Sequence, residues 1–207
     1  MSKKILVATT NPGKIAELTA MLNLDVEWVS LSEFSDIAEI QEDGLTFAEN
    51  ARKKALGYAK ATGLWTIAED SGLVVDALGG EPGVKSARFS GEKLKGEDRT
   101  LIDHRNIAKV LEMMKDVPEA SRTARFVCHI CLADSEKVLA EAQGRFEGYI
   151  ARRQKGSNGF GYDPVFYVAA LEKTVAELSP GQKNAISHRA DAVSKLMPKL
   201  TSLLGRD

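Results

Sequence analysis

The chain has 207 residues, of which 43% are hydrophobic and 28% are charged, a composition typical of one large globular domain or two small lobes. Its formal net charge of -1 gives no broad electrostatic attraction toward nucleic acid or an anionic membrane. No apolar run is long enough to span a bilayer, and "MSKK" leads into a strand without a signal-peptide pattern, so a cytoplasmic protein without membrane or nucleic-acid partners is expected.

Strand-like and helical patterns alternate along the chain. Strands are expected at residues 4–9, 26–31, 64–69, 124–133 and 138–142, which predicts an α/β fold. Because no repeat, low-complexity tract or linker divides the sequence, residues 1–207 are interpreted as one domain.

The first predicted helix follows the turn "TNPG" and places Lys14 in its first turn. That end of a helix carries the positive pole of the macrodipole and unpaired N–H groups, so it disfavours a cation. A phosphate bound at the turn would resolve the conflict, whereas a lysine with its ammonium in water is the simpler alternative. The turn is not a Walker A loop, because it lacks the upstream glycine and the Ser or Thr after the lysine.

The best-signalled helix begins near Thr46. Thr46 and Glu49 form an S/T-x-x-E capping box, and Gly63 supplies a stop. Lys54 lies one turn after Asn50 and off the helix face that is small enough to pack closely on a sheet, which comprises Ala48, Ala51, Ala55 and Ala59.

Two further helices are predicted downstream of a polar segment. The segment 91–100, "GEKLKGEDRT", is expected to be a solvated loop. The last helix runs from about Ser187 to Leu204, and Pro198 is expected to kink or interrupt it. The other helix spans residues 101–115 and is expected to bury Ile107, Val110, Leu111 and Met114.

Two pairs of acids could hold a metal ion. Glu42 and Asp43 lie in "QEDG", and Glu69 and Asp70 are expected to end a buried strand, where α/β sheets form ligand crevices. Strand alternation sends Glu69 and Asp70 to opposite faces unless the following Ser-Gly turn rotates the second. Clustered carboxylates suit Mg²⁺ shared with substrate phosphates, while an acidic strand end leading into a turn is the alternative.

A glycine-rich stretch, "GSNGFGYDP" at residues 156–164, could bind a flat ligand. Its glycines allow close backbone approach, Phe160 or Tyr162 can stack on a base, and Asp163 is held extended by the next proline. The alternative is a hairpin corner with two packing aromatics.

The stretch "NAISHRADA" again places cationic or donor side chains in the first turn of a helix, where the dipole disfavours them. Ser187 is a plausible N-cap, which places His188 and Arg189 in the first turn of the last helix. An electron-rich partner such as a carbonyl oxygen would resolve the conflict with the dipole, and a solvent-facing pair is the alternative.

The only cysteines, Cys128 and Cys131, lie in the strand-like run "ARFVCHICLA" and point to opposite faces of it. With no second pair, a redox or zinc fragment is the weaker interpretation, and buried strand thiols are favoured. His129 is interpreted in the same way.

Taken together, seven motifs in this order resemble the inosine triphosphate pyrophosphatase family over residues 4–200: "ATTNPGK", "GLTFAENARKKA", "AEDSGL", "ALGGEPG", "SAR", "FGYDP" and "KNAISHR". The resemblance implies an elongated mixed sheet flanked by helices, with two lobes around a deep substrate cleft, in a homodimer. It also implies Mg²⁺-dependent hydrolysis of ITP, dITP and XTP to the nucleoside monophosphate and pyrophosphate.

The resemblance assigns roles to individual residues. Catalysis would fall to Asp70, Glu69 and Lys54, with Asp70 activating water, and the metal would be held by Glu42 and Asp70. The triphosphate would be bound by Lys54 together with Thr9, Thr10, Asn11, Gly13 and Lys14. Ser71 would lie at the substrate, and the base would meet Phe160, Gly161, Tyr162, Asp163, Lys183, His188 and Arg189.

Selectivity follows from the donors around the base. His188 and Arg189 would donate to the 6-oxo group of the purine, whereas the adenine amino group would leave them unpaired. Rejection of GTP requires a feature near purine C2 that the sequence does not reveal.

The sequence departs from the family at two positions. Glu69 stands where many bacterial relatives have aspartate, which leaves open whether it helps the metal directly. Lys85 stands where relatives often carry an aromatic residue, which puts a pocket-edge or dimer contact in doubt, and the segment 91–100 looks longer than usual.

Three other hypotheses compete with this one. A Maf-like pyrophosphatase for modified pyrimidine nucleotides is disfavoured by "SHR" and "FGYDP". A nucleotide sensor that does not hydrolyse its ligand would have little reason to gather Glu42, Glu69 and Asp70 beside an anion. The third is an α/β protein whose polar motifs are only caps and turns.

Overall fold

The computed structural model describes residues 2–91 and 98–205, which divide into two compact units. The first unit comprises the described residues up to 70, residues 128–144 and those from 188 onward, and the second comprises residues 71–127 and 145–187. Within the described ranges, no helix is both long and apolar enough to cross a bilayer.

The described residues form a mixed sheet of seven strands in the order β2-β1-β3-β4-β5-β6-β7. β1 pairs in parallel with β2 and β3, whereas β6 is antiparallel to β5 and β7. The α/β prediction is therefore confirmed. The strands are β1 (Lys4–Val7), β2 (Glu27–Ser30), β3 (Trp65–Val75), β4 (Thr123–Ala133), β5 (Val138–Ile150), β6 (Phe166–Val168) and β7 (Lys173–Thr174).

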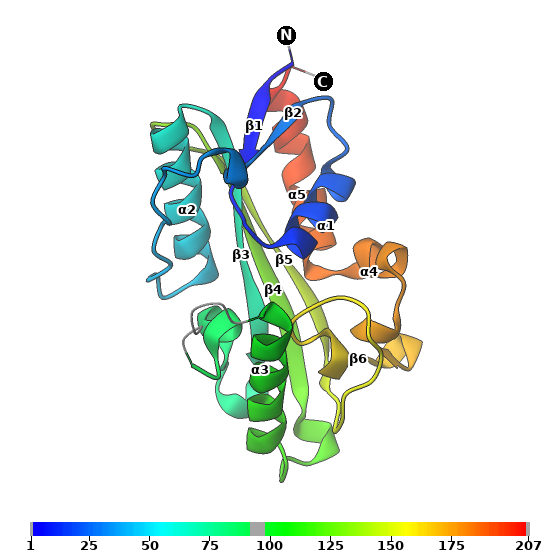
Figure 1. Ribbon diagram of the computed structural model, residues 1–207. Coiled ribbons are helices and arrows are strands. Elements are labelled where there is room, and N and C mark those ends of the chain that lie inside the picture. The colour runs from blue at the N-terminus through cyan, green and yellow to red at the C-terminus, as the bar shows by residue number, and fades with distance from the viewer. Residues whose placement is uncertain (1, 92–97, 206–207) are drawn as a thin grey trace. The chain divides into compact units, whose positions relative to one another are not determined.

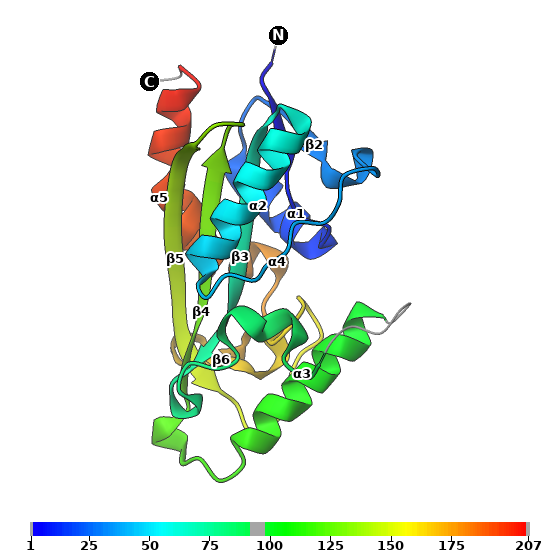
Figure 2. The same cartoon turned by 90° about the vertical axis from the view of Figure 1, so that its left-hand side faces the viewer.

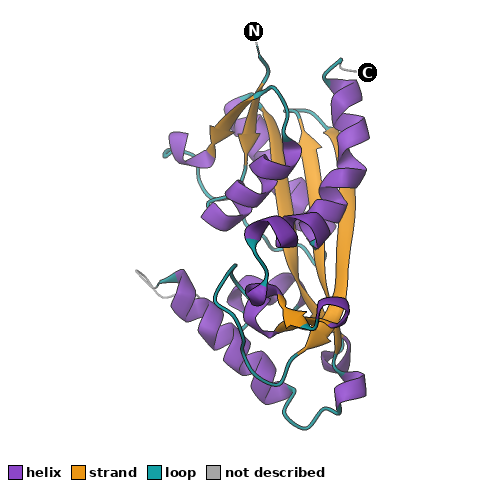
Figure 3. Cartoon of the chain, turned by 90° about the vertical axis from the view of Figure 1, so that its right-hand side faces the viewer, coloured by secondary structure: helices purple, strands orange, loops and turns teal. Residues whose placement is uncertain are grey.

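In the first unit, helices cover both faces of the sheet (Figure 1). Alternation along β1 sends Ile5 and Val7 into one core with α1 (Pro12–Leu22) and α5 (His188–Leu203). Leu6 and Ala8 enter the opposite core with α2 (Phe47–Thr62). Figure 2 views this unit from the side of α2, and Figure 3 from the side of α1 and α5.

The two cysteines follow the same alternation. Cys128 belongs to the core under α1 and α5, and Cys131 to the core under α2. Both are free and buried, and burial raises the pKa of Cys131 to about 12. The interpretation as buried strand thiols on opposite faces is confirmed.

The second unit has its own core around α3 (Arg99–Met113). Ile107, Val110 and Met114 are buried there with Phe166, as the helical period predicts, whereas Leu111 is only partly buried against this core. α3 begins two residues earlier than predicted, because the Asp98 side chain caps the N–H of Thr100 at 3.1 Å. The remainder of the predicted loop 91–100 falls mainly on residues 92–97, which lie outside the described residues. A short helix that was not predicted, α4 (Pro180–Ile186), precedes α5.

Two strands are longer than predicted because their glycines do not form turns. β3 continues past Asp70 to Val75, so the expected Ser-Gly turn is wrong. A Cβ on Gly72 would lie 2.6 Å from the carbonyl oxygen of Gly83, so glycine there allows close backbone packing within a strand. β5 likewise continues past Gly144, where a Cβ would lie 2.1 Å from the carbonyl oxygen of His188.

Two details of the predicted helices are also corrected. Pro198 does not interrupt α5, since it lies on the exposed side, where water can solvate the carbonyl that a proline leaves unbonded. Thr46 accepts a hydrogen bond from the N–H of Glu49 at 3.1 Å, as predicted, but the Glu49 carboxylate accepts from Leu45 at 2.7 Å, so the capping box is not reciprocal.

An ionic cluster links α2 to β4 and β5 and yields a prediction for acid stability. Arg52 binds Glu141 through two bonds of 2.7 Å, and His129 lies 3.1 Å from the same carboxylate. The bond from Arg52 is the main reason why the pKa of Glu141 falls to about 2.

We expect Glu141→Gln to lower the free energy of unfolding by about 1 kcal/mol at neutral pH, because solvent partly screens the pair. A depressed carboxylate pKa stabilises the fold above the unfolded-state value of about 4.3. The difference between wild type and variant should therefore shrink as the pH falls from that value toward about 2, in urea titrations at several pH values. A difference between wild type and Glu141→Gln that stays constant over this pH range would contradict the prediction.

Candidate functional site

The first unit has a topological switch point at the carboxyl end of β1. β1 lies between β2 and β3, and the helices that follow β1 and β2 pack on opposite faces of the sheet. Open α/β sheets bind ligands at such a point, beyond the ends of the strands. The pairing of β1 with β3 ends at Val7 and Ile67, so the turn after β1 and the acids of β3 both follow it directly.

The turn after β1 is closed by its own side chains. The Asn11 side chain accepts from the N–H groups of Gly13 at 2.9 Å and Lys14 at 3.3 Å, and the Thr9 hydroxyl accepts from the N–H of Asn11 at 3.2 Å. Two of the backbone donors expected to face an anion are therefore already satisfied. The groups left to meet an anion include the Lys14 ammonium and the hydroxyl of Thr10, which is exposed.

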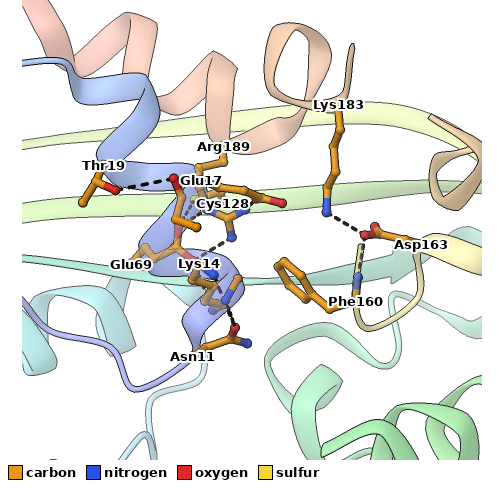
Figure 4. Close-up of polar contacts among 12 residues, drawn as sticks. Asn11, Lys14, Glu17, Thr19, Glu69, Cys128, Phe160, Asp163, Lys183 and Arg189 are labelled. Atoms are coloured by element: carbon orange, nitrogen blue, oxygen red, sulfur yellow. Dashed lines mark hydrogen bonds and ion pairs between the residues drawn. The ribbon is translucent and has the colours of Figure 1, made fainter. Parts of the chain in front are cut away.

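Lys14 and Arg189 share the Glu69 carboxylate (Figure 4). Lys14 Nζ lies 3.1 Å from Glu69 Oε1, and Arg189 donates from Nη2 to Oε1 at 2.7 Å and from Nε to Oε2 at 2.6 Å. Burial alone would raise the pKa of Glu69, but Arg189 and Lys14 outweigh it and hold this pKa well below the usual value. Glu69 is thus the anion that both helix-terminal cations face.

Arg189 is fully buried, so it does not face solvent. Its partners are carboxylates of the protein rather than a carbonyl oxygen. Besides Glu69, its Nη1 donates to Glu17 of α1, a residue that the sequence reasoning missed. Arg189 occupies the same stripe of α5 as Val193, Leu196 and Leu200, and this spacing is the signal that could have revealed its burial. His188 is also buried, next to Arg189, and its charge further lowers the pKa of Glu69.

A second cluster lies on the α2 side of β3. Glu42 Oε1 is 3.0 Å from Lys54 Nζ, and Asn50 Nδ2 donates to Asp70 Oδ2 at 3.0 Å. Burial raises the pKa of Asp70, and Glu42 raises it further against the opposing effects of Lys54 and Lys14. Glu69 therefore binds Arg189 and Asp70 binds Asn50, as strand alternation predicts, while the charge of Lys14 acts on both carboxylates.

Asn50 is the second residue that the sequence reasoning missed. It is completely buried, and its amide oxygen accepts from the N–H of Gly44 at 2.8 Å while its nitrogen binds Asp70. It therefore ties the loop that carries Glu42 to the Asp70 carboxylate. A buried amide four residues before a buried lysine on the same helix is the only local sign of this role.

Glu42 and Asp70 fit a hard divalent cation. The described residues hold no group of three or more His, Cys, Asp or Glu that could ligate a metal. A protein site with two carboxylates, completed by water and substrate phosphates, is typical of Mg²⁺. Burial and the nearby Glu42 penalise the ionised form of Asp70, and a cation between the two carboxylates would remove that penalty.

The second unit contains a separate group around Phe160 (Figure 4). Asp163 Oδ2 accepts from Lys183 Nζ at 2.6 Å and from the N–H of Phe160 at 2.9 Å, and Lys183 Nζ lies 4.3 Å from the centre of the Phe160 ring. Gly159 has a φ of +79°, and a Cβ there would lie 2.0 Å from Asp163 Oδ2. The glycine is therefore required for Asp163 to hold the ring and the lysine together.

The rest of this loop is held by contacts within the second unit. The N–H of Gly161 donates to Asp103 of α3 at 2.8 Å, and the buried Tyr162 donates its hydroxyl to the carbonyl oxygen of Ser86 at 2.9 Å. Asp103 was missed by the sequence reasoning, since it lies 58 residues away. Ser71 lies in β3 and is half-buried.

The fold and this constellation define an α/β protein with lysines and carboxylates gathered at a switch point, the class of site that binds phosphorylated ligands with a divalent cation. The model of the Ham1 family matches residues 5–199. The chain belongs to the Ham1 family.

Known relatives resemble the chain over nearly its whole length. A dITP/XTP pyrophosphatase of Desulforamulus reducens is 47% identical over 97% of this chain and 96% of its own, and one of Bacillus subtilis is 46% identical over 94% and 95%. The solved structure of a HAM1 protein from Coxiella burnetii has a TM-score of 0.84 at 42% identity, covering 97% of this chain and 99% of its own. The Staphylococcus aureus Ham1 protein has a TM-score of 0.84 at 40% identity, covering 97% and 100%. The family resemblance inferred from the motifs is thereby confirmed.

Proposed function

We propose that this protein hydrolyses the triphosphates of deaminated purine nucleosides, ITP, dITP and XTP, to the nucleoside monophosphate and pyrophosphate. The observation that carries the proposal is the buried Asp70 carboxylate, with a raised pKa, among Lys54, Lys14 and Glu42. The names of the near-full-length relatives support the substrate class.

The proposed reaction is attack of water on the α-phosphorus with pyrophosphate as the leaving group. Asp70 accepts the proton of the attacking water, a task that suits a carboxylate whose pKa burial has raised. Lys14 and Lys54 offset the charge that develops on the bridging and equatorial oxygens, while Thr9 and Thr10 bind the triphosphate. Mg²⁺ held by Glu42 and Asp70 would polarise the phosphoryl oxygens. No covalent nucleophile is required.

Glu69 serves this reaction through Lys14 in our proposal, rather than as a metal ligand. Its two oxygens already receive Arg189 and Lys14, whereas Asp70 accepts from Asn50. The longer glutamate side chain keeps the charge that relatives supply with aspartate.

The base is assigned to Phe160, Lys183, His188 and Arg189 in this proposal. The Phe160 ring stacks on the purine, with Lys183 held beside it by Asp163. Three of the five N–H groups of Arg189 bind Glu69 and Glu17. The proposal assigns the remaining two to the 6-oxo group, which the fully buried Arg189 would meet only once the side chains that cover it move on binding. We also propose a homodimer in the cytoplasm, where nucleoside triphosphates are made and used.

A substrate panel tests the function. Purified protein with Mg²⁺ is mixed in parallel with ITP, XTP, ATP, GTP and dTTP, and pyrophosphate and orthophosphate are assayed separately. We expect rapid pyrophosphate release from ITP and XTP only, and none without Mg²⁺. Turnover of dTTP instead of ITP and XTP would favour a Maf-like activity on pyrimidine nucleotides, and ITP binding without release would indicate a sensor.

A further inference from the structure

We propose that Cys128 is a positioning residue for Lys14, acting through Glu69. The proposal rests on the function proposed above, since it concerns the lysine assigned to the triphosphate. In this proposal the thiol acts as a hydrogen-bond donor to Glu69, in addition to filling space in the core.

The geometry places the thiol on the carboxylate that holds Lys14. Cys128 Sγ lies 3.3 Å from Glu69 Oε2, and both side chains are buried (Figure 4). The same oxygen accepts from Arg189 Nε, while Oε1 accepts from Arg189 Nη2 and faces Lys14. The carboxylate is therefore held by donors on both oxygens, and Cys128 is a neutral donor beside the cations Arg189 and Lys14.

The thiol acts as a hydrogen-bond donor rather than as an anion. Burial is the main cause that raises the pKa of Cys128 well above the usual value, and the Glu69 carboxylate raises it further. Since an ionised Glu69 can only accept, the proton lies on sulfur and points at Oε2. Arg189 would still hold both oxygens after loss of this donor, so the carboxylate would shift within that fork rather than rotate freely, and Lys14 would follow Oε1.

Cys131 is a matched control in the same strand. It is equally buried and lies three residues away, on the opposite face of the sheet. In the described part of the chain its thiol makes no hydrogen bond, so replacing it removes volume without removing a donor. Alanine at either position should therefore leave a cavity of similar size, and only the change at Cys128 should act on Lys14.

The test compares Cys128→Ala and Cys128→Ser with Cys131→Ala in the full chain. Two readouts are used: the kcat and KM of ITP hydrolysis with Mg²⁺, and the affinity for inorganic pyrophosphate by calorimetry, which requires no turnover. We expect Cys128→Ala to weaken pyrophosphate binding and to lower kcat/KM for ITP, each by up to about tenfold, because the thiol is a weak donor and acts on Lys14 only through Glu69. Cys128→Ser, which keeps an O–H donor, should recover most of the loss, and Cys131→Ala should change neither value.

Several results would overturn the proposal. Equal kcat/KM changes in the two alanine variants would reduce the effect to packing, and a serine variant as impaired as the alanine variant would exclude the donor role. Weakened pyrophosphate binding in Cys128→Ala alone, with no turnover of ITP by wild type, would sustain the positioning role and remove the proposed function. If wild type hydrolysed ITP but Cys128→Ala and Cys131→Ala behaved alike, the proposed function would stand and the positioning role would be excluded.

Discussion

Asp70→Asn is expected to reduce pyrophosphate release from ITP by on the order of 10³-fold or more, because it removes the proposed proton acceptor and one of two metal-binding carboxylates. The fold should survive, since the asparagine oxygen can still accept from Asn50 and the variant no longer buries a charge. Turnover is measured with saturating Mg²⁺, and thermal unfolding is followed by circular dichroism.

The matched control is Asp43→Asn in the neighbouring "QEDG" loop. Asp43 is exposed and pairs with the exposed Lys53, so its loss should leave both turnover and melting temperature unchanged. A folded Asp70→Asn protein with wild-type turnover would remove Asp70 from the mechanism.

Glu69→Gln is expected to lower the free energy of unfolding by about 3–5 kcal/mol, the cost of leaving a buried cation without its partner. Arg189 is fully buried, and the variant would leave it only Glu17 as a carboxylate partner among the described contacts. A glutamine amide would also turn one donor toward the guanidinium donors. The change is measured by urea unfolding at neutral pH.

Glu27→Gln serves as the exposed counterpart. Glu27 pairs with Lys4 at 2.8 Å, with both side chains about half exposed, and its replacement should produce no measurable change in unfolding. If Glu69→Gln unfolded like Glu27→Gln, the buried network would have no part in holding α1 and α5 on the sheet.

Periodic elements were predictable because their signals are local. The turn and helix after β1, the helix that begins after Thr46 and the buried face of α3 all follow from spacing and caps. Glycine was ambiguous in the same sequence. Gly63 ends α2 in a left-handed conformation. Gly72 instead lies within a strand, where the backbone of Gly83 leaves no room for a Cβ. Only the atoms packed against each glycine distinguish these two roles.

The residues of the site could be predicted from the sequence, but the contacts that these residues make with one another could not. Family motifs bring together Lys14, Glu42, Lys54, Glu69 and Asp70, and the structure places all of them in the first unit. Lys14 and Arg189, in the first turns of α1 and α5, each indicated a nearby electron-rich partner. For Lys14 that partner was interpreted as the phosphate of the substrate. The contact of Arg189 with Glu69 spans 120 residues, so no local pattern could identify Glu69 as the partner.

Because β3 runs continuously through Asp70, the proposed hydrolytic centre lies on a rigid element, whereas the proposed base-binding residues 156–164 lie in a loop. Asp70 belongs to an eleven-residue strand, so its backbone cannot adjust to a new ligand without breaking the sheet. Residues 156–164 carry left-handed glycines at 156, 159 and 161, in a loop without sheet pairing of its own. A library aimed at how the base stacks is therefore best confined to that loop, because selection can then vary the surroundings of Phe160 while the donors to the 6-oxo group and the hydrolytic centre stay fixed.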